Sequence, residues 1–200
     1  MGRQGLIDAT LALLRTTPPE ELTLLDIATS VGVDPALIRY YFGNKNGLLR
    51  AATLHLMEFT QALGERLVQG TSIRALVRER ISLIIDTGQQ NPHFLKLVMR
   101  EIYISDAPTG EPPRAFLEST AQRGVALSEA ILAARPVTDG PLPQIDPRLL
   151  HVAMLGACTY FATAQPLFEV LFENEGDAHA LAQRYIDFMT DFVLRGIGAS

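Results

Sequence analysis

Residues 22–42 read LTLLDIATSVGVDPALIRYYF, and this segment predicts two short helices joined by a tight turn. The helices span about 23–30 and 35–41. Gly32 lies in the turn, which requires a left-handed backbone that glycine adopts cheaply. Two such helices joined by a turn of about four residues form a helix-turn-helix, which places its second helix in a DNA major groove. The segment therefore predicts a helix-turn-helix.

Capping residues support both helix starts. Thr23 can accept a hydrogen bond at the start of the first helix, and Asp26 stands three positions later, where a capping box usually has Glu or Gln. Asp34 can cap the second helix, and Pro35 suits its first position because its fixed φ is that of a helix. The first start thus carries a partial capping box, and the second carries a cap and a proline.

Helical periodicity continues through the rest of the chain, without hairpin turns between alternating strands. The further predicted helices span about 3–15, 45–69, 72–89, 92–104, 114–134, 147–173 and 177–195. Proline and glycine mark two loops, at 105–113 and 135–147. The sequence therefore predicts an all-α fold of about nine helices.

Five stretches in and around the helix-turn-helix carry a family pattern: Leu22–Ala28, Val31–Val33, Leu37–Phe42, Asn44–Lys45 and Leu48–Leu49. In this combination the segment 6–55 resembles the tetracycline-repressor-like (TetR) family of regulators. The resemblance implies a three-helix DNA-binding domain followed by a larger helical ligand-binding and dimerisation domain. We place the first domain at 1–50 and the second at 51–200.

The seven candidate DNA contacts have side chains that can reach bases or phosphates, and by resemblance they match contact positions of the family: Thr23, Pro35, Ala36, Arg39, Tyr40, Tyr41 and Lys45. Arg39 can donate two hydrogen bonds to a guanine, and Pro35 and Ala36 can contact a thymine methyl group. The tyrosine and threonine hydroxyl groups, and Lys45 in the first turn of a helix, can bind phosphate. Three of them have an alternative without DNA contact: Tyr41 can pack against the first helix, and Arg39 and Lys45 can be ordinary surface residues.

The charge distribution limits how strongly one copy can bind DNA. The net charge is −5, and residues 1–56 contain five basic and five acidic side chains. Phosphate contacts dominate affinity for DNA, so DNA binding must depend on local geometry in this neutral segment. Two copies on a palindromic site would double the contacts, which favours a homodimer.

The last two predicted helices have the pattern of an interface between subunits. No charged residue occurs in 149–168, and a helix that is apolar all round is buried on all sides or lies in a membrane. Polar Thr159, Thr163 and Gln165, Pro166 and the lack of a flanking basic cluster disfavour the membrane. The final helix has a broad apolar stripe, so the two helices predict a four-helix dimer interface. Ordinary intramolecular core is the alternative.

A ligand pocket is predicted between helices of the larger domain, where apolar residues are joined by a few polar groups. Its candidate residues are Phe94, Leu97, Val98, Tyr103, Phe116, His151, Met154, Cys158, Phe161 and Gln165. They favour an apolar or aromatic ligand, and the alternative for each is ordinary core.

Other kinds of chemistry lack a sequence pattern. There is no phosphate-binding glycine loop, no HExxH and no paired-cysteine zinc pattern, and His151 and Cys158 are too few for a zinc site. The single cysteine and the absence of a signal-peptide pattern predict a cytoplasmic protein. We expect no cofactor, no metal and no enzymatic activity.

The sequence thus predicts a transcriptional regulator, a repressor that a small molecule releases from a palindromic operator. Ligand binding is expected to reposition the helix at 45–69 and so change the spacing of the two recognition helices. The alternative is a helical adaptor that binds a protein partner through the charge-free helix.

Overall fold

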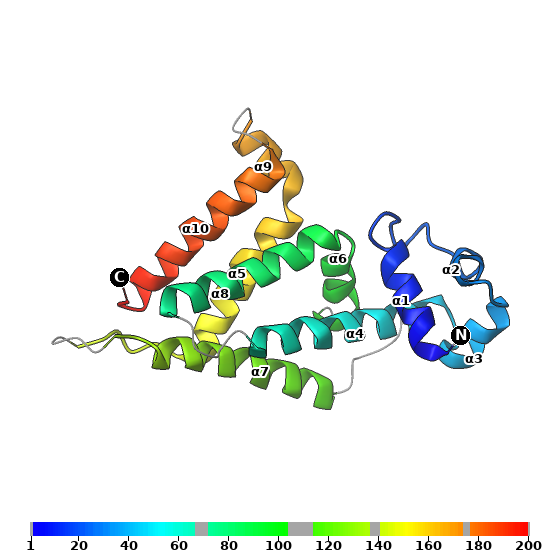
Figure 1. The fold of residues 1–200 in the computed structure, drawn as a ribbon, viewed down its shortest axis with the longest axis horizontal. Coiled ribbons are helices and arrows are strands. Elements are labelled where there is room, and N and C mark those ends of the chain that lie inside the picture. Colours follow the sequence, from blue (N-terminus) through cyan, green and yellow to red (C-terminus); the bar gives the residue numbers. More distant parts are fainter. Residues whose placement is uncertain (1, 67–71, 104–113, 137–140, 174–176, 200) are drawn as a thin grey trace. The chain divides into compact units, whose positions relative to one another are not determined.

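The computed structural model describes residues 2–66, 72–103, 114–136, 141–173 and 177–199, and Figure 1 shows their arrangement. Within these ranges all regular elements are helical: ten α-helices and one π-helical segment. The contacts divide the chain into two compact units. Unit 1 contains residues 1–59 and 88–117, and unit 2 contains residues 60–87 and 118–200. The predicted all-α fold is confirmed, with one more α-helix than expected for a reason given below.

Unit 1 begins with a helical head, which we define as residues 3–59. Its helices are α1 (Arg3–Leu13), α2 (Leu24–Val31), α3 (Pro35–Phe42) and the first part of α4 (Lys45–Arg66). The core of the head is built from aliphatic side chains: Leu6, Ile7, Leu14, Leu22, Ile27, Ala28, Ile38, Leu48, Leu49 and Ala52. The head therefore has its own apolar core, which holds α3 in a fixed orientation.

Both predicted caps of the helix-turn-helix are present. The Asp26 N–H donates to Thr23 Oγ1 at 3.1 Å, and the Thr23 N–H donates to Asp26 Oδ2 at 2.9 Å, so the capping box is complete. The Thr23 hydroxyl, and after it the Thr23 N–H, donates to the Asp26 carboxylate, and these two bonds hold the pKa of Asp26 below its usual range. Asp34 Oδ1 accepts from the Ala36 N–H at 2.7 Å, and Gly32 has the expected positive φ of 67°. An aspartate is therefore enough to close the box.

Gly47 lies where α4 approaches the end of α3. A Cβ at this position would lie 2.1 Å from the carbonyl oxygen of Phe42, which is far inside van der Waals contact. The Gly47 N–H donates to Asn44 Oδ1 at 2.9 Å, so Asn44 caps the start of α4. The two helices therefore approach closely at this position, and only glycine fits there.

A second segment of unit 1 packs onto the head. The sequence predicted one helix at 92–104, whereas the structure has the short α6 (Phe94–Val98) followed by a π-helical segment, η1 (Met99–Tyr103). Leu97 of α6 is 2% exposed and belongs to the core cluster of the head. Arg100 donates to the fully buried Glu101 at 2.8 Å and lies 3.9 Å from Glu20 of the head. Such π-helical turns are rare and are frequently found at functional sites.

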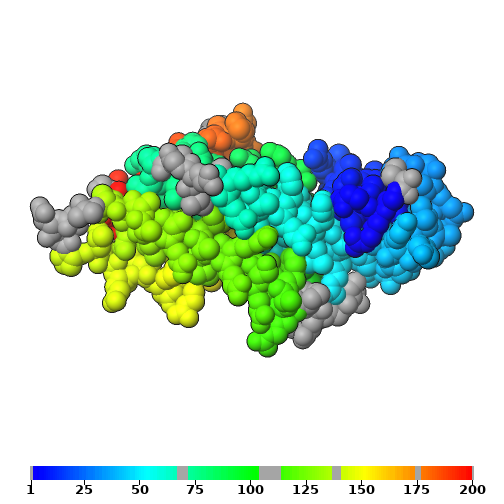
Figure 2. All heavy atoms as spheres, turned by 60° about the horizontal axis from the view of Figure 1, so that its bottom comes forward, coloured from blue at the N-terminus to red at the C-terminus, as the bar shows by residue number. Residues whose placement is uncertain are grey.

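Unit 2 is built around a separate core. Its helices are most of α5 (Ile73–Gln90) and α7 (Arg114–Ala133), together with α8 (Pro147–Thr163), α9 (Gln165–Leu171) and α10 (Ala178–Gly196). Their buried side chains include Val77, Ile81, Ile85, Ile131, Met154, Cys158, Phe161, Ala182 and Ile186. Two ion pairs join α5 to α10, Arg74 with Asp191 at 2.7 Å and Arg78 with Asp187 at 3.0 Å. In Figure 2 the exposed side of α7 lies next to the first turns of α8.

The predicted single helix at 147–173 is wrong, because it breaks at Ala164 into α8 and α9. Pro166 has no N–H to donate to the carbonyl four residues earlier, and its ring disfavours helical backbone at Gln165. None of the helices in the described ranges combines the length and apolarity that crossing a bilayer requires.

Candidate functional site

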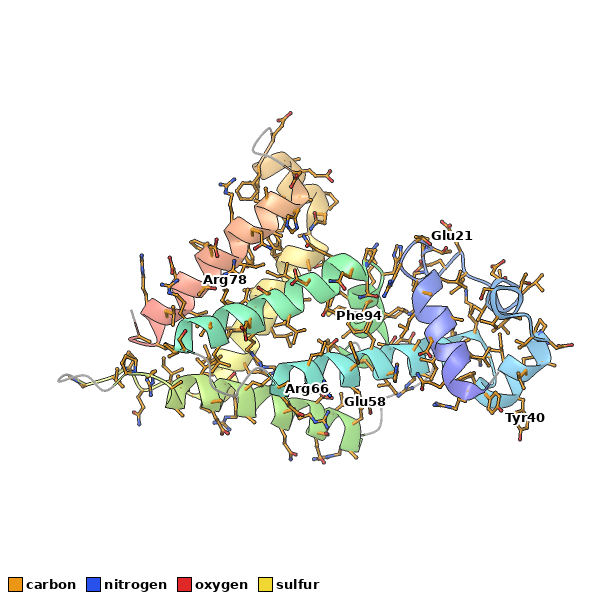
Figure 3. The ribbon with its side chains drawn as sticks, viewed as in Figure 1. Glu21, Tyr40, Glu58, Arg66, Arg78 and Phe94 are labelled. Carbon is orange, nitrogen blue, oxygen red and sulfur yellow. The ribbon has the colours of Figure 1, made fainter. Side chains whose placement is uncertain are left out.

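The outer face of α3 is open to solvent. Ala36, Arg39, Tyr40 and Tyr41 are exposed, and Pro35 is half-buried. Tyr40 is 81% exposed and points away from the head in Figure 3. In contrast, Ile38 on the inner face is completely buried in the core of the head. The helix therefore presents the five predicted α3 residues on or beside one accessible surface.

Aromatic rings order part of this surface. The rings of Tyr40 and Tyr41 pack edge to face with centroids 5.2 Å apart, and Tyr41 contacts Phe42 at 6.2 Å. The Arg3 guanidinium lies over the Phe42 ring at 5.2 Å and so connects α1 to this end of α3. Tyr41 is 39% exposed, so its side chain stays partly open to solvent while its ring contacts Tyr40 and Phe42. The Arg39 side chain has no ion pair with any residue in the described ranges.

Lys45 and Thr23 already have bonds within the head. Lys45 Nζ donates to the carbonyl oxygens of Leu22 at 2.9 Å and Pro19 at 3.0 Å, which fastens the loop after α1 to the start of α4. The Thr23 hydroxyl donates to Asp26 at 2.6 Å. The sequence did not reveal these structural roles, because the partners of Lys45 lie more than twenty positions away. Phosphate binding by both residues stays a prediction.

Five predicted ligand residues lie in unit 1. Phe94, Leu97 and Val98 are buried, Phe116 is half-buried and Tyr103 is 47% exposed. Leu97 packs into the core of the head, so it has a structural role in this unit.

The other five predicted ligand residues lie on α8 and α9 in unit 2. Met154, Cys158 and Phe161 are buried in the core, and Phe161 stacks on Tyr185 with ring centroids 4.0 Å apart. Gln165 is half-buried and its amide donates to the Phe161 carbonyl at 3.4 Å. His151 is half-buried and bonds to Arg80, as described next. Ligand binding by these residues stays a prediction.

Arg80 is a polar residue of the unit 2 core that the sequence analysis missed. It is 7% exposed, and its Nη2 bonds to His151 Nδ1 at 2.8 Å and to the Gly124 carbonyl at 3.2 Å. Burial lowers the pKa of Arg80 to about 10, and burial, followed by the Arg80 charge, lowers the pKa of His151. The signal was available in the sequence, because Arg80 occupies a position in the apolar stripe that includes Val77 and Ile81.

A surface cleft of about 580 Å³ lies between α7 and the start of α8. It is lined by Val125, Glu129 and residues 144–148, and none of the predicted ligand residues lines it. Among the described residues, no group of three or more His, Cys, Asp or Glu side chains is placed to hold a metal ion.

The outer faces of α8 and α10 expose large apolar side chains. On α8, Leu149, Val152 and Tyr160 are each more than half exposed. On α10, Phe188 and Phe192 are 62% and 64% exposed, and their rings stack 6.1 Å apart. These residues form apolar surface on the two helices that were predicted to meet a second subunit.

Comparison with known proteins agrees with the resemblance seen in the sequence and with the observed all-α fold. Residues 6–52 match the family described as "Bacterial regulatory proteins, tetR family", and residues 71–200 match "Tetracyclin repressor-like, C-terminal domain". The chain is 30% identical to the HTH-type transcriptional regulator BetI of Proteus mirabilis over 97 residues, which is 47% of this chain and 48% of BetI. The identity to BetI of Rhizobium meliloti is also 30%, over 60% of this chain and 59% of that protein. The chain thus spans about half the length of the curated relatives it matches.

Solved structures resemble the whole fold. The transcriptional regulator FadR from Bacillus subtilis, crystallised with stearoyl-CoA, superposes with a TM-score of 0.62 at 17% identity, over 94% of this chain and 98% of FadR. A protein of unknown function from Rhodococcus sp. RHA1 superposes with a TM-score of 0.73 at 17% identity, over 99% of this chain and 95% of that one. At such low identity the likeness establishes the fold alone.

Proposed function

Because this chain belongs to the tetracycline-repressor-like (TetR) family of bacterial regulatory proteins, we propose that it is a transcriptional regulator that binds DNA and responds to a small molecule. The observation that carries this proposal is the exposed face of α3, where Arg39 has no ion pair with any described residue, held on the capped helical head. In this role the DNA-binding domain is residues 1–50 and the remaining chain is the ligand-binding and dimerisation domain. The chain works in the cytoplasm as a regulator rather than an enzyme.

The chemistry of α3 supports the assignment of its contacts. Arg39 donates to a guanine, and Pro35 and Ala36 contact thymine methyl groups. Tyr40 and Tyr41 donate their hydroxyl groups to phosphates and so fix the position of the helix. Thr23 and Lys45 contribute from the neighbouring helix starts, where backbone N–H groups also favour anions.

A homodimer supplies the second set of contacts. The exposed apolar side chains of α8 and α10 support a four-helix interface between two copies, since such a surface is normally covered. A twofold pair of heads then binds a palindromic operator, with the recognition helices roughly 34 Å apart.

The larger domain binds the effector, an apolar or aromatic molecule, and its binding repositions α4 so that the repressor leaves the operator. FadR of Bacillus subtilis, which has this fold, was crystallised in complex with stearoyl-CoA, and this supports a small-molecule effector for the present chain. Both family descriptions concern regulators, so the alternative of a helical adaptor is not favoured.

A gel-shift titration on the DNA flanking its gene tests the proposal. Arg39→Ala and Tyr40→Ala should each weaken binding about fivefold or more, because a base or phosphate contact contributes about 1–3 kcal/mol. Arg15→Ala is the matched control, since it removes the same charge from an exposed position outside α3. Equal affinity of the Arg39→Ala, Tyr40→Ala and wild-type proteins would refute the assigned interface.

A further inference from the structure

Arg80 is a buried cation with unused hydrogen-bond donors. It lies on α5, and both of its bonds to described residues leave from Nη2 and reach α7 and α8. Nε is enclosed and has no acceptor, and Nη1 bonds to none of the described residues. Three of the five N–H groups of the guanidinium are therefore free to bind something else.

The neighbours of Arg80 carry no compensating charge. No carboxylate in the described ranges lies within ion-pair distance of its guanidinium, and its near titratable groups are His151 and Cys158. Burial lowers the pKa of His151 and raises the pKa of Cys158 to about 12, so both side chains are uncharged at neutral pH. Arg80 keeps its proton at that pH. The cluster therefore has a net positive charge inside an apolar core.

The orientation of the guanidinium is fixed by a glycine. A Cβ on Gly124 would lie 2.3 Å from the His151 ring, so only glycine lets this ring lie against α7. The Gly124 carbonyl also accepts from the Ser128 hydroxyl at 3.4 Å. These contacts fix the position of Nη2. Because the guanidinium is planar and rigid, the N–H groups of Nε and Nη1, which bond to no described residue, then have a fixed orientation.

Buried charges in proteins are normally paired, since an isolated one is costly, and a guanidinium is the side chain that best matches an oxyanion. We propose that Arg80 binds the carboxylate or phosphate group of the effector, whose remaining body is apolar. The apolar body follows from Met154, Cys158 and Phe161, which share the core of unit 2 with this cluster. This inference rests on the proposed function only in taking the ligand to be the effector.

Three probes of equal chain length separate the contribution of the anionic group from that of the alkyl chain. They are decanoate, decyl phosphate and decanol, each used below its micellar concentration. Calorimetric titration of the full chain should show binding of at least one acid and at least tenfold weaker binding of the alcohol. The better of the two acids identifies carboxylate or phosphate as the group that fits.

Arg80→Met should weaken binding of that acid on the order of ten- to a hundredfold, because hydrogen bonds to a charged group are lost. The ligand-free melting temperature of this variant should stay equal or rise, since an unpaired buried charge is removed. Arg80→Lys, which keeps the charge but not the planar fork, is a second variant and should also bind more weakly. Arg78→Met is the matched control on the same helix, where the arginine is exposed and paired with Asp187, and it should bind like wild type.

Equal binding of acid and alcohol, unchanged binding by both Arg80 variants, or binding of neither acid would overturn the inference. The gel shift is measured on the same samples. Acid binding that depends on Arg80 without DNA binding would refute the regulator and leave the anion site. DNA binding without acid binding of this kind would refute the anion site alone.

Discussion

Replacing Gly47 by alanine should destabilise the head, even though alanine is the better helix former. The added Cβ would lie 2.1 Å from the Phe42 carbonyl oxygen and 3.2 Å from its carbonyl carbon. The obstacle is backbone at the end of α3, where Gly43 already has a positive φ of 75°, so no side-chain rotation can relieve the clash. The start of α4 must therefore move away from α3.

The size of the effect follows from two opposing contributions. Overpacking of this kind costs about 1–3 kcal/mol, and we take the upper end because the neighbour is backbone. The helix propensity of alanine returns about 1 kcal/mol. The net loss is about 2 kcal/mol, which lowers the melting temperature of a chain of this length by roughly 4–8 °C.

Circular dichroism at the helix band, followed through a thermal melt, measures this loss. Gly196→Ala is the control, because it makes the same exchange at the exposed end of α10 where a Cβ meets nothing within 4 Å. An unchanged or higher melting temperature for Gly47→Ala, with the control behaving as expected, would refute the argument from close approach.

Three further predictions concern the caps, the subunit interface and the core. Thr23→Ala should cost about 1 kcal/mol in a denaturant titration. The pKa of Asp26 is lowered by bonds from the Thr23 hydroxyl and N–H, so the stabilisation is complete above the ordinary value of 3.8 and is lost as the pH falls through the lowered pKa. Thr23→Ala removes the hydroxyl bond and keeps the N–H bond, so it should reduce that acid-dependent loss. Val152→Asp combined with Phe188→Asp should give a monomer in sedimentation velocity, and a dimer would contradict the interface. Leu97→Ala should cost about 2–5 kcal/mol in urea unfolding, and a loss below 1 kcal/mol would show that α6 does not stabilise the head.

The parts of the structure that sequence patterns predicted well depend on short-range chemistry. The bonds between Thr23 and Asp26 join residues three positions apart, and the Asp34 cap joins residues two apart. Such bonds can be recognised from residue types and spacing. For the same reason the turn at Gly32 was predicted correctly, since its φ is dictated locally.

The parts that were missed depend on contacts across the chain. The bonds of Lys45 to the loop at 19–22 and of Arg80 to His151 join residues far apart in sequence, and no local pattern specifies them. The break at Ala164 had a local cause in Pro166, but the apolar run around it suggested one continuous helix. The π-helical turn after α6 contains the buried Glu101 and Ile102, and its residues carry no local signature that distinguishes it from an α-helix.

The place of Leu97 in the core of the head has a consequence for synthesis on the ribosome. The segment 6–52 emerges first and can form its helices and both caps while the chain is still growing. Its core stays one side chain short until residue 97 has left the exit tunnel, some forty-five residues after the segment is complete. A nascent chain halted before α6 should therefore be cleaved by protease within the head more rapidly than one halted after α6.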